Sequence, residues 1–215
     1  MGNRLLKLFL ISFIIFNCNS ESSSDASIST QKKQTNKLNP ENTTTLVVDS
    51  ENSIIIWTGK KIASSHEGTI NILSGEIVIN DDNILSGNIE VDMSSILNTD
   101  LEDEKYKNKL TSHLKNEDFF NVIEYPISTL LINSAEKNSN LDYNFTGELT
   151  IKGITHSVEF VGKVENTGVR YSANIKLIFD RTLWNIKNGS GQFFENLGDK
   201  MILDDIELNI AINTL

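Results

Sequence analysis

Three histidines offer the widest choice of chemistry in this sequence of 215 residues, and they lie far apart, at His66, His113 and His156. Imidazole can ligate a metal ion or transfer a proton near neutral pH. No two of them have the spacing of an HExxH helix, and no Gly-x-Ser-x-Gly turn supplies a nucleophile. A metal site assembled from the three histidines stays open as a minor alternative. We expect no catalytic residues and no cofactor.

The acidic clusters are the other candidates for chemistry, at residues 81–82, 102–104 and 204–205. The first lies in a predicted turn, the second at a helix start and the third at a strand start. Carboxylates at such places are typical of solvated surface and helix caps. With 19 basic and 29 acidic side chains, the chain carries a formal net charge of −10, which argues against nucleic-acid binding.

The lone cysteine, Cys18, follows a basic start and an apolar run at residues 8–16, which is too short to span a bilayer. The pattern resembles a bacterial lipoprotein signal, in which the cysteine carries diacylglycerol; a plain secretory signal is the alternative. We predict a signal peptide at 1–17, a flexible tether at 18–45 and a folded domain at 46–215. Acylation would anchor the protein in the bacterial cell envelope, on the periplasmic side or at the outer membrane.

Most of the predicted domain shows the period-two alternation of half-buried strands. In the strongest example, Tyr171, Ala173, Ile175, Leu177 and Phe179 share one face and polar residues the other. Similar strong strands are predicted near 141–152, 158–165 and 206–213, and weaker ones at 53–60, 67–79, 84–93 and 127–133.

A sheet with one apolar face must bury that face, and the single predicted helix, at about Leu101–Lys115, is too small to cover it. We therefore predict an all-β fold, an antiparallel lipocalin-like barrel of about eight strands with this short helix over one end. Inward-facing Gly87, Gly147, Gly162 and Ala173 have two readings. They indicate either an open interior or local bulges and bends.

Several motifs, in order and spacing, resemble the YceI-like domain family from about Ser53 to Ile212. They are WTGKK (57–61), HEGTI (66–70), VDMSSI (91–96), HLKNEDFFNVIEYP (113–126), GELTIKGITHSVEF (147–160) and FDRTLWNI (179–186). The resemblance implies a lipocalin-like barrel with a deep apolar cavity, an envelope location, and binding of polyisoprenoid-type or other long-chain lipids. A filled barrel that serves as an interaction module is the alternative.

On this basis we predict which residues contact a lipid. The predicted walls are Phe145, Leu149, Phe160, Val164, Tyr171, Ile175, Leu177 and Phe179. Phe119 and Phe120, after the helix, either seal the cavity or touch the ligand. Arg181 would bind a headgroup or, alternatively, pair with a nearby acid. Trp57 and Trp184 would line a mouth or pack under a loop.

Overall fold

The computed structural model describes residues 42–81, 83–139 and 141–215. The predicted signal peptide, Cys18 and the tether as far as residue 41 lie outside the described residues. The elements are β1 (Thr43–Val47), β2 (Ile54–Lys61), β3 (Ser65–Asn80), β4 (Asn83–Asn98), α1 (Glu104–Lys115), β5 (Ile127–Lys137), β6 (Asp142–Ile151), β7 (Ile154–Asn166), β8 (Tyr171–Asp180), the short 3₁₀ helices η2 (Arg181–Trp184) and η3 (Gly198–Lys200), and β9 (Ile202–Asn213).

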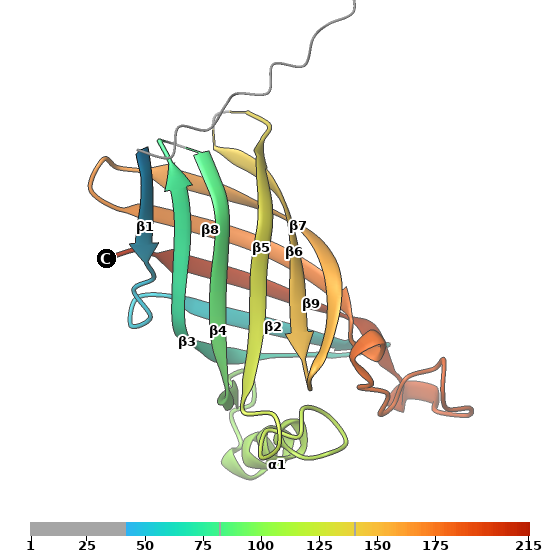
Figure 1. Ribbon diagram of the computed structural model, residues 1–215. Helices are drawn as coiled ribbons and strands as arrows, with labels where there is room; N and C mark the ends of the chain where they lie inside the picture. Colours follow the sequence, from blue (N-terminus) through green and yellow to red (C-terminus); the bar gives the residue numbers. More distant parts are fainter. Residues whose placement is uncertain (1–41, 82, 140) are drawn as a thin grey trace, which may run out of the picture. The chain divides into compact units, whose positions relative to one another are not determined.

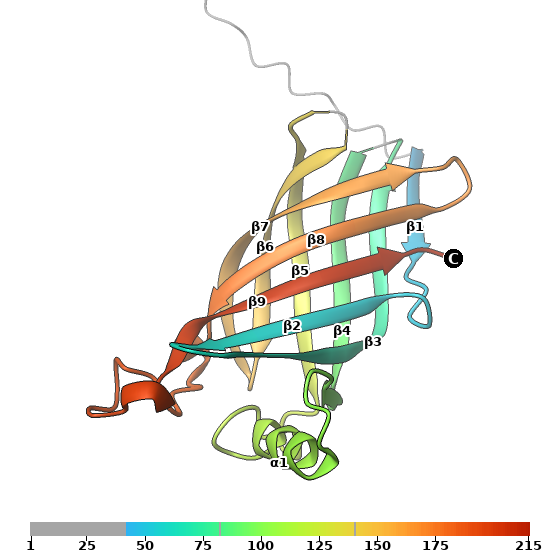
Figure 2. The same ribbon diagram turned by 180° about the vertical axis from the view of Figure 1, so that it is seen from behind.

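The strands form one antiparallel sheet that closes on itself (Figures 1 and 2). The order β3-β2-β9-β8-β7-β6-β5-β4 returns to β3 through the long β3–β4 hairpin, which makes a ring of eight strands. Closure removes the exposed sheet edges on which other chains could pair. The predicted barrel of about eight antiparallel strands is confirmed.

The first strand, β1, was not predicted, and it begins at Thr43, inside the segment expected to be a tether. It pairs with the second half of β3, from Glu76 to Asn80, whereas β2 pairs with the first half. A bridge between Val48 and Thr214 joins the end of β1 to the end of β9. Thus β1 and β2, which the irregular segment 48–53 separates, pair with different halves of β3 on the same side of that strand.

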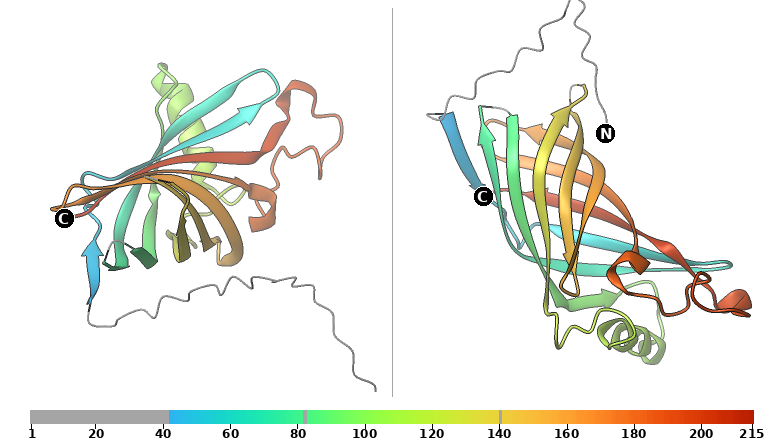
Figure 3. Two further views of the ribbon diagram at one scale, coloured as in Figure 1. Left: turned by 90° about the horizontal axis from the view of Figure 1, so that it is seen from above. Right: turned by 45° about the vertical axis from the view of Figure 1, so that its right-hand side comes forward.

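The helix α1 lies in the connection between β4 and β5, at the end of the barrel where those strands end and begin (Figures 1 and 2). It starts three residues later than predicted because Asp103 is its N-cap and accepts hydrogen bonds from the Lys105 and Tyr106 amides. The long β8–β9 connection, residues 181–201, projects from the same end (Figures 1 and 3). Thus the two longest connections flank one end of the barrel.

Tight turns join most neighbouring strands. Between β6 and β7, Lys152 has a φ of 51° and Gly153 a φ of 71°, the conformation that two-residue hairpin turns require. The alternating pattern holds within the strands but stops at their ends, so Leu141 and Val169, which keep the two-residue period of the inward-facing residues, lie in turns and are exposed.

Candidate functional site

The interior of the barrel contains two adjoining cavities of very different size. The larger one, about 490 Å³, lies at the α1 end, and we call it the helix-end chamber. Its lining includes Trp57, Met93, Ile96, Leu114, Phe119 and Phe120. The smaller one, about 80 Å³, lies further along the barrel among Ile79, Ile84, Ile132, Phe145, Ile175 and Ile212, and we call this region the packed end. Ile55, Val91, Leu149 and Leu208 line both cavities.

The predicted wall residues divide between these two regions. Phe145, Val164, Tyr171, Ile175 and Leu177 line the small cavity of the packed end, and Leu149 lines both cavities. Phe179 lines the helix-end chamber.

Phe160 lines neither cavity. It is buried and its ring stacks on Phe145 with 5.1 Å between the ring centroids. Phe160 is therefore packing in the wall rather than part of the cavity surface.

The segment after α1 folds back and places both phenylalanines against the chamber. The Phe119 amide donates to the Asn116 carbonyl and the Phe120 amide to the Leu114 carbonyl, so the chain reverses around the helix end. Phe119 is buried with its ring edge-on to His113, at 4.9 Å between centroids, and Phe120 is half-buried. Both side chains close the chamber from the helix side and would contact whatever fills it.

The inward glycines do not create the open volume. A Cβ on Gly147 would lie 2.3 Å from the Leu131 carbonyl oxygen, and the sheet register shifts nearby, between Ile132 and Ser134. A Cβ on Gly162 would lie 3.0 Å from the Asn174 carbonyl oxygen, and one on Gly87 would lie 2.7 Å from Ile77. Neighbouring atoms thus occupy the space beside each of these three glycines, which argues against the open-interior reading, and the register shift beside Gly147 is a bulge of the kind that the other reading expects.

Basic side chains line the helix-end chamber where it is most exposed to solvent. Lys60 and Lys109 are exposed and Lys61 is half-buried. His66 and His113, which are far apart in sequence, line the same chamber. This edge therefore carries several basic side chains, although the chain as a whole is acidic, and Lys60 Nζ lies 3.9 Å from Glu207 Oε2.

Each of the two chamber histidines has its own carboxylate partner. His66 Nδ1 lies 3.0 Å from Asp100 Oδ2, and His113 Nε2 lies 3.3 Å from Asp118 Oδ2. Burial alone would raise the pKa of Asp100, but hydrogen bonds from His66, the Glu67 amide and the Asn98 side chain outweigh burial and hold that pKa below its ordinary value.

His156 lies elsewhere, with its Nε2 3.0 Å from the Leu183 carbonyl oxygen and its ring edge-on to Trp184. Among residues 42–81, 83–139 and 141–215, no group of three or more His, Cys, Asp or Glu side chains could hold a metal ion. The described part of the chain therefore offers no support for the three-histidine metal site.

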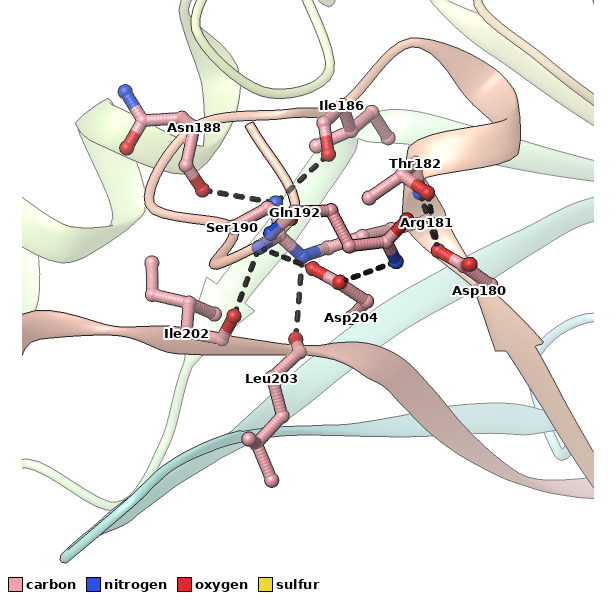
Figure 4. Close-up of polar contacts among 10 residues, drawn as sticks. All are labelled: Asp180, Arg181, Thr182, Ile186, Asn188, Ser190, Gln192, Ile202, Leu203 and Asp204. Carbon is pink, nitrogen blue, oxygen red and sulfur yellow. Dashed lines mark hydrogen bonds and ion pairs between the residues drawn. The ribbon is translucent and has the colours of Figure 1, made fainter. Parts of the chain in front are cut away.

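Arg181 requires a correction, because its guanidinium is fully engaged inside the protein (Figure 4). It is 2% exposed, and its N–H groups donate to the carbonyl oxygens of Ile186, Asn188, Ile202 and Leu203 and to Asp204 Oδ1. A guanidinium has five N–H donors, and these five acceptors use them all. Arg181 reaches the chamber lining but cannot bind a headgroup through an N–H, so the ion-pair alternative applies.

The Arg181 network fixes the β8–β9 connection against the start of β9. Burial lowers the pKa of the guanidinium, while Asp204 and Asp180 raise it. Gln192 Nε2 donates to the other oxygen of Asp204 at 2.8 Å, and Asp180 accepts from the Thr182 amide and hydroxyl (Figure 4). The connection is therefore held in place by buried polar contacts together with Trp184 and Ile186, which are buried in the core of the barrel.

The two tryptophans are both buried but differ in their polar contacts. Trp184 packs against Phe179, and its Nε1–H donates to the Leu149 carbonyl at 3.1 Å. Trp57 Nε1 has no hydrogen-bond partner among the described residues, and neither has Ser128 Oγ. Both of these side chains line the helix-end chamber. Sequence reasoning left the role of Trp57 open and missed Ser128 altogether, because nothing in a sequence marks a missing partner.

A family model for the YceI-like domain matches residues 46–214. The chain belongs to the YceI-like domain family. No curated protein shows a significant match to the sequence.

Two solved structures share the YceI-like fold. The crystal structure of Burkholderia cenocepacia BcnA aligns with a TM-score of 0.63 at 21% identity, covering 78% of this chain and 99% of that one. A polyisoprenoid binding domain from Saccharophagus degradans, implicated in plant cell wall breakdown, aligns with a TM-score of 0.58 at 10% identity, covering 78% and 96%. At these identities the likeness establishes the fold alone. None of the helices in the described residues has the length and apolar character needed to cross a membrane.

Proposed function

We propose that this YceI-like protein binds a polyisoprenoid-type or other long-chain lipid, with the tail in the helix-end chamber. The observation that carries the proposal is the size and lining of this cavity, about 490 Å³ bounded mainly by apolar side chains, with Phe119 and Phe120 on the helix side. The family and the polyisoprenoid-binding neighbour support it. Ligand pockets of a few hundred cubic ångströms with few polar groups are typical of small-molecule sites.

The energetics of such binding need no catalytic group. Each buried methylene contributes about 0.8 kcal/mol, so ten of them contribute roughly 8 kcal/mol before association costs of several kcal/mol are subtracted. The basic edge formed by Lys60, Lys61 and Lys109 would remain in contact with water. We accordingly propose a carrier or sequestering protein rather than an enzyme.

Lipid binding is tested on the full chain, purified without organic solvent and then extracted for mass spectrometry. We expect a long-chain lipid to copurify, and added geranylgeraniol to raise the melting temperature. Repeated preparations without lipid, combined with no thermal shift, would overturn the proposal in favour of the filled interaction module. Metal analysis of the same preparation tests the histidine alternative.

We also propose that Cys18, which precedes the described residues, carries a lipid anchor and places the barrel in the bacterial envelope. The support is the sequence pattern alone. Expressed in a Gram-negative host, the wild-type chain should fractionate with membranes, and Cys18→Ser should move to the soluble periplasmic fraction. Identical fractionation of the two chains would contradict acylation.

A further inference from the structure

Two polar groups in the wall of the helix-end chamber are buried without a partner. Trp57 is 7% exposed and Ser128 is 5% exposed, and both line this chamber. Among the residues that the structure describes, Trp57 Nε1 and Ser128 Oγ are the buried side-chain nitrogen and oxygen atoms for which no hydrogen bond is found. Buried polar groups are normally paired, because an unpaired one loses its hydration and receives nothing in return.

The orientation of Trp57 is fixed by the backbone beside it. Trp57 on β2 is paired with Gly68 on β3, and a Cβ added at Gly68 would lie 2.6 Å from the Trp57 ring. The glycine thus allows the indole to lie flat against the neighbouring strand. The indole therefore packs against the backbone of that strand.

Ser128 is fixed by the sheet in a similar way. It lies second in β5, paired with Val91 of β4, at the end of the barrel where the chain arrives from α1. The Met93 amide donates to the Pro126 carbonyl just before it, so the pairing of the two strands extends past Ser128. A hydroxyl in this position is anchored in a strand rather than in a mobile loop.

The other tryptophan, Trp184, has a hydrogen-bond partner for its indole N–H. Trp184 is 1% exposed, and its indole N–H reaches the Leu149 carbonyl at 3.1 Å. Its side chain does not line the helix-end chamber. Among the described residues, the two buried groups left unpaired therefore both belong to side chains that line the helix-end chamber. Each of the two atoms has almost no accessible surface, so contact with a ligand oxygen requires neighbouring side chains to shift.

The chemistry of the two groups defines what they would recognise. An indole N–H can only donate, and a serine hydroxyl can donate or accept. A ligand atom that satisfies Trp57 must therefore be an acceptor. A charged oxygen so deep in an apolar wall would be costly, whereas a neutral ether, carbonyl or hydroxyl oxygen would not.

We propose that Trp57 and Ser128 form a polar subsite that selects lipids carrying a neutral hydrogen-bond-accepting oxygen inside the chamber over plain hydrocarbons. The inference rests on the proposed function, because it requires that the chamber hold a lipid. The inference adds the class of lipid, which is one that carries a neutral oxygen atom in the part of the chain inside the chamber. This oxygen is separate from any charged group that would lie at the edge formed by Lys60, Lys61 and Lys109.

The test is a competition between two matched probes on the full chain. One probe is geranylgeranyl methyl ether, and the other is the hydrocarbon in which a methylene replaces the ether oxygen. Both are offered together from a cyclodextrin carrier, and the protein-bound ratio is measured by mass spectrometry. We expect the wild type to enrich the ether about tenfold relative to Trp57→Phe, the effect of one well-formed hydrogen bond in a dry site. Ser128→Ala should reduce the enrichment by a smaller factor.

The protein-bound ratio of the two probes tests the subsite independently of folding and of lipid binding itself. Trp57→Phe keeps an aromatic ring and Ser128→Ala keeps nearly the size of the side chain, and the midpoint of urea unfolding reports whether each variant is folded. Loss of enrichment in either variant, with hydrocarbon uptake retained, supports the proposal and identifies the contact. Enrichment that is the same in wild type and in both variants overturns the subsite but leaves the lipid-binding function intact. Absence of both probes from the wild-type protein overturns the two together.

Discussion

The helix-end chamber and the packed end belong to one barrel, yet one is open and the other almost solid. Their volumes, about 490 Å³ and about 80 Å³, differ sixfold although the same strands pass through both. The packed end is filled by isoleucines and by the stacked rings of Phe145 and Phe160. The helix-end chamber is bounded by α1 and by Phe119 and Phe120, which reach it from a connection rather than from a strand.

This difference shows that alternation along strands does not determine whether a barrel is hollow. The inward faces of both regions are apolar, and the small residues lie where backbone or side chains already fill the space. The open volume arises where the wall is completed by a helix and a loop instead of by inward side chains from all strands. Replacements at the two ends should therefore have different consequences, which the following variants measure.

The largest expected effect is Phe145→Ala at the packed end. Phe145 is 2% exposed and stacks between Tyr143 and Phe160, so its removal leaves a cavity in a tightly filled region. We expect the free energy of unfolding in urea to fall by about 4 kcal/mol. The matched replacement Phe120→Ala, at a half-buried position beside existing space, should cost only about 1 kcal/mol. Equal losses would show that the two ends are packed alike.

Arg181→Met should have the next largest effect on stability, and this residue lines the helix-end chamber. The change leaves Asp204 and the carbonyl oxygens of Ile186, Asn188, Ile202 and Leu203 without their donor. We expect a loss of about 3 kcal/mol in urea unfolding, because breaking a buried charged network leaves polar groups unpaired. Arg170→Met, at an exposed position in the β7–β8 turn, is the control and should change stability by less than about 0.5 kcal/mol.

The barrel itself could be predicted from sequence, and the character of the site only in part. Period-two alternation identified β6 to β9 well because each has one face against the interior. β1 was not predicted, because its pairing with residues 76–80 gives no local signal within a short threonine-rich segment. The role of Arg181 depends on the carbonyl groups that the 181–203 segment places around its guanidinium. The lack of a hydrogen-bond partner for the Trp57 indole N–H depends on which groups the fold places near it. Both are properties of the assembled structure rather than of a motif.

Gly147→Ala tests the close approach of strands at the packed end. A methyl group there would lie 2.3 Å from a backbone oxygen of Leu131, which cannot move without disturbing the β5–β6 pairing. We expect a loss of about 2 kcal/mol in urea unfolding. Gly87→Ala should cost less, since the atoms it meets are the flexible ends of Ile77 and Ile132. A neutral or stabilising Gly147→Ala would show that this end has unused room.

Asp103→Ala tests how strongly α1 is held over the chamber. The Asp103 side chain accepts from the Lys105 and Tyr106 amides and so satisfies the start of the helix. We expect a loss of about 1 kcal/mol, with faster hydrogen exchange of the α1 amides. Exchange in β6 and β7 should be unchanged. Equally faster exchange in the strands would mean that helix and barrel open as one unit.

The smallest effect concerns the charge of Asp100, beside the β3 and β4 ends that border the chamber. Its Oδ2 contacts His66, and its Oδ1 accepts from the Glu67 amide and the Asn98 side chain. Folding lowers the pKa of Asp100 below the ordinary value of 3.8. The contribution of the Asp100 charge to the free energy of unfolding is therefore complete above pH 3.8 and is lost as the pH falls through the pKa of the folded state.

The contribution of this partly exposed group is of the order of 0.5 kcal/mol. Wild type should therefore be more stable than Asp100→Asn at pH 6, and the gap in urea unfolding should close below pH 3.8. A gap that persisted in acid would mean that Asp100 acts through the geometry of its hydrogen bonds, which asparagine alters, and not through its charge.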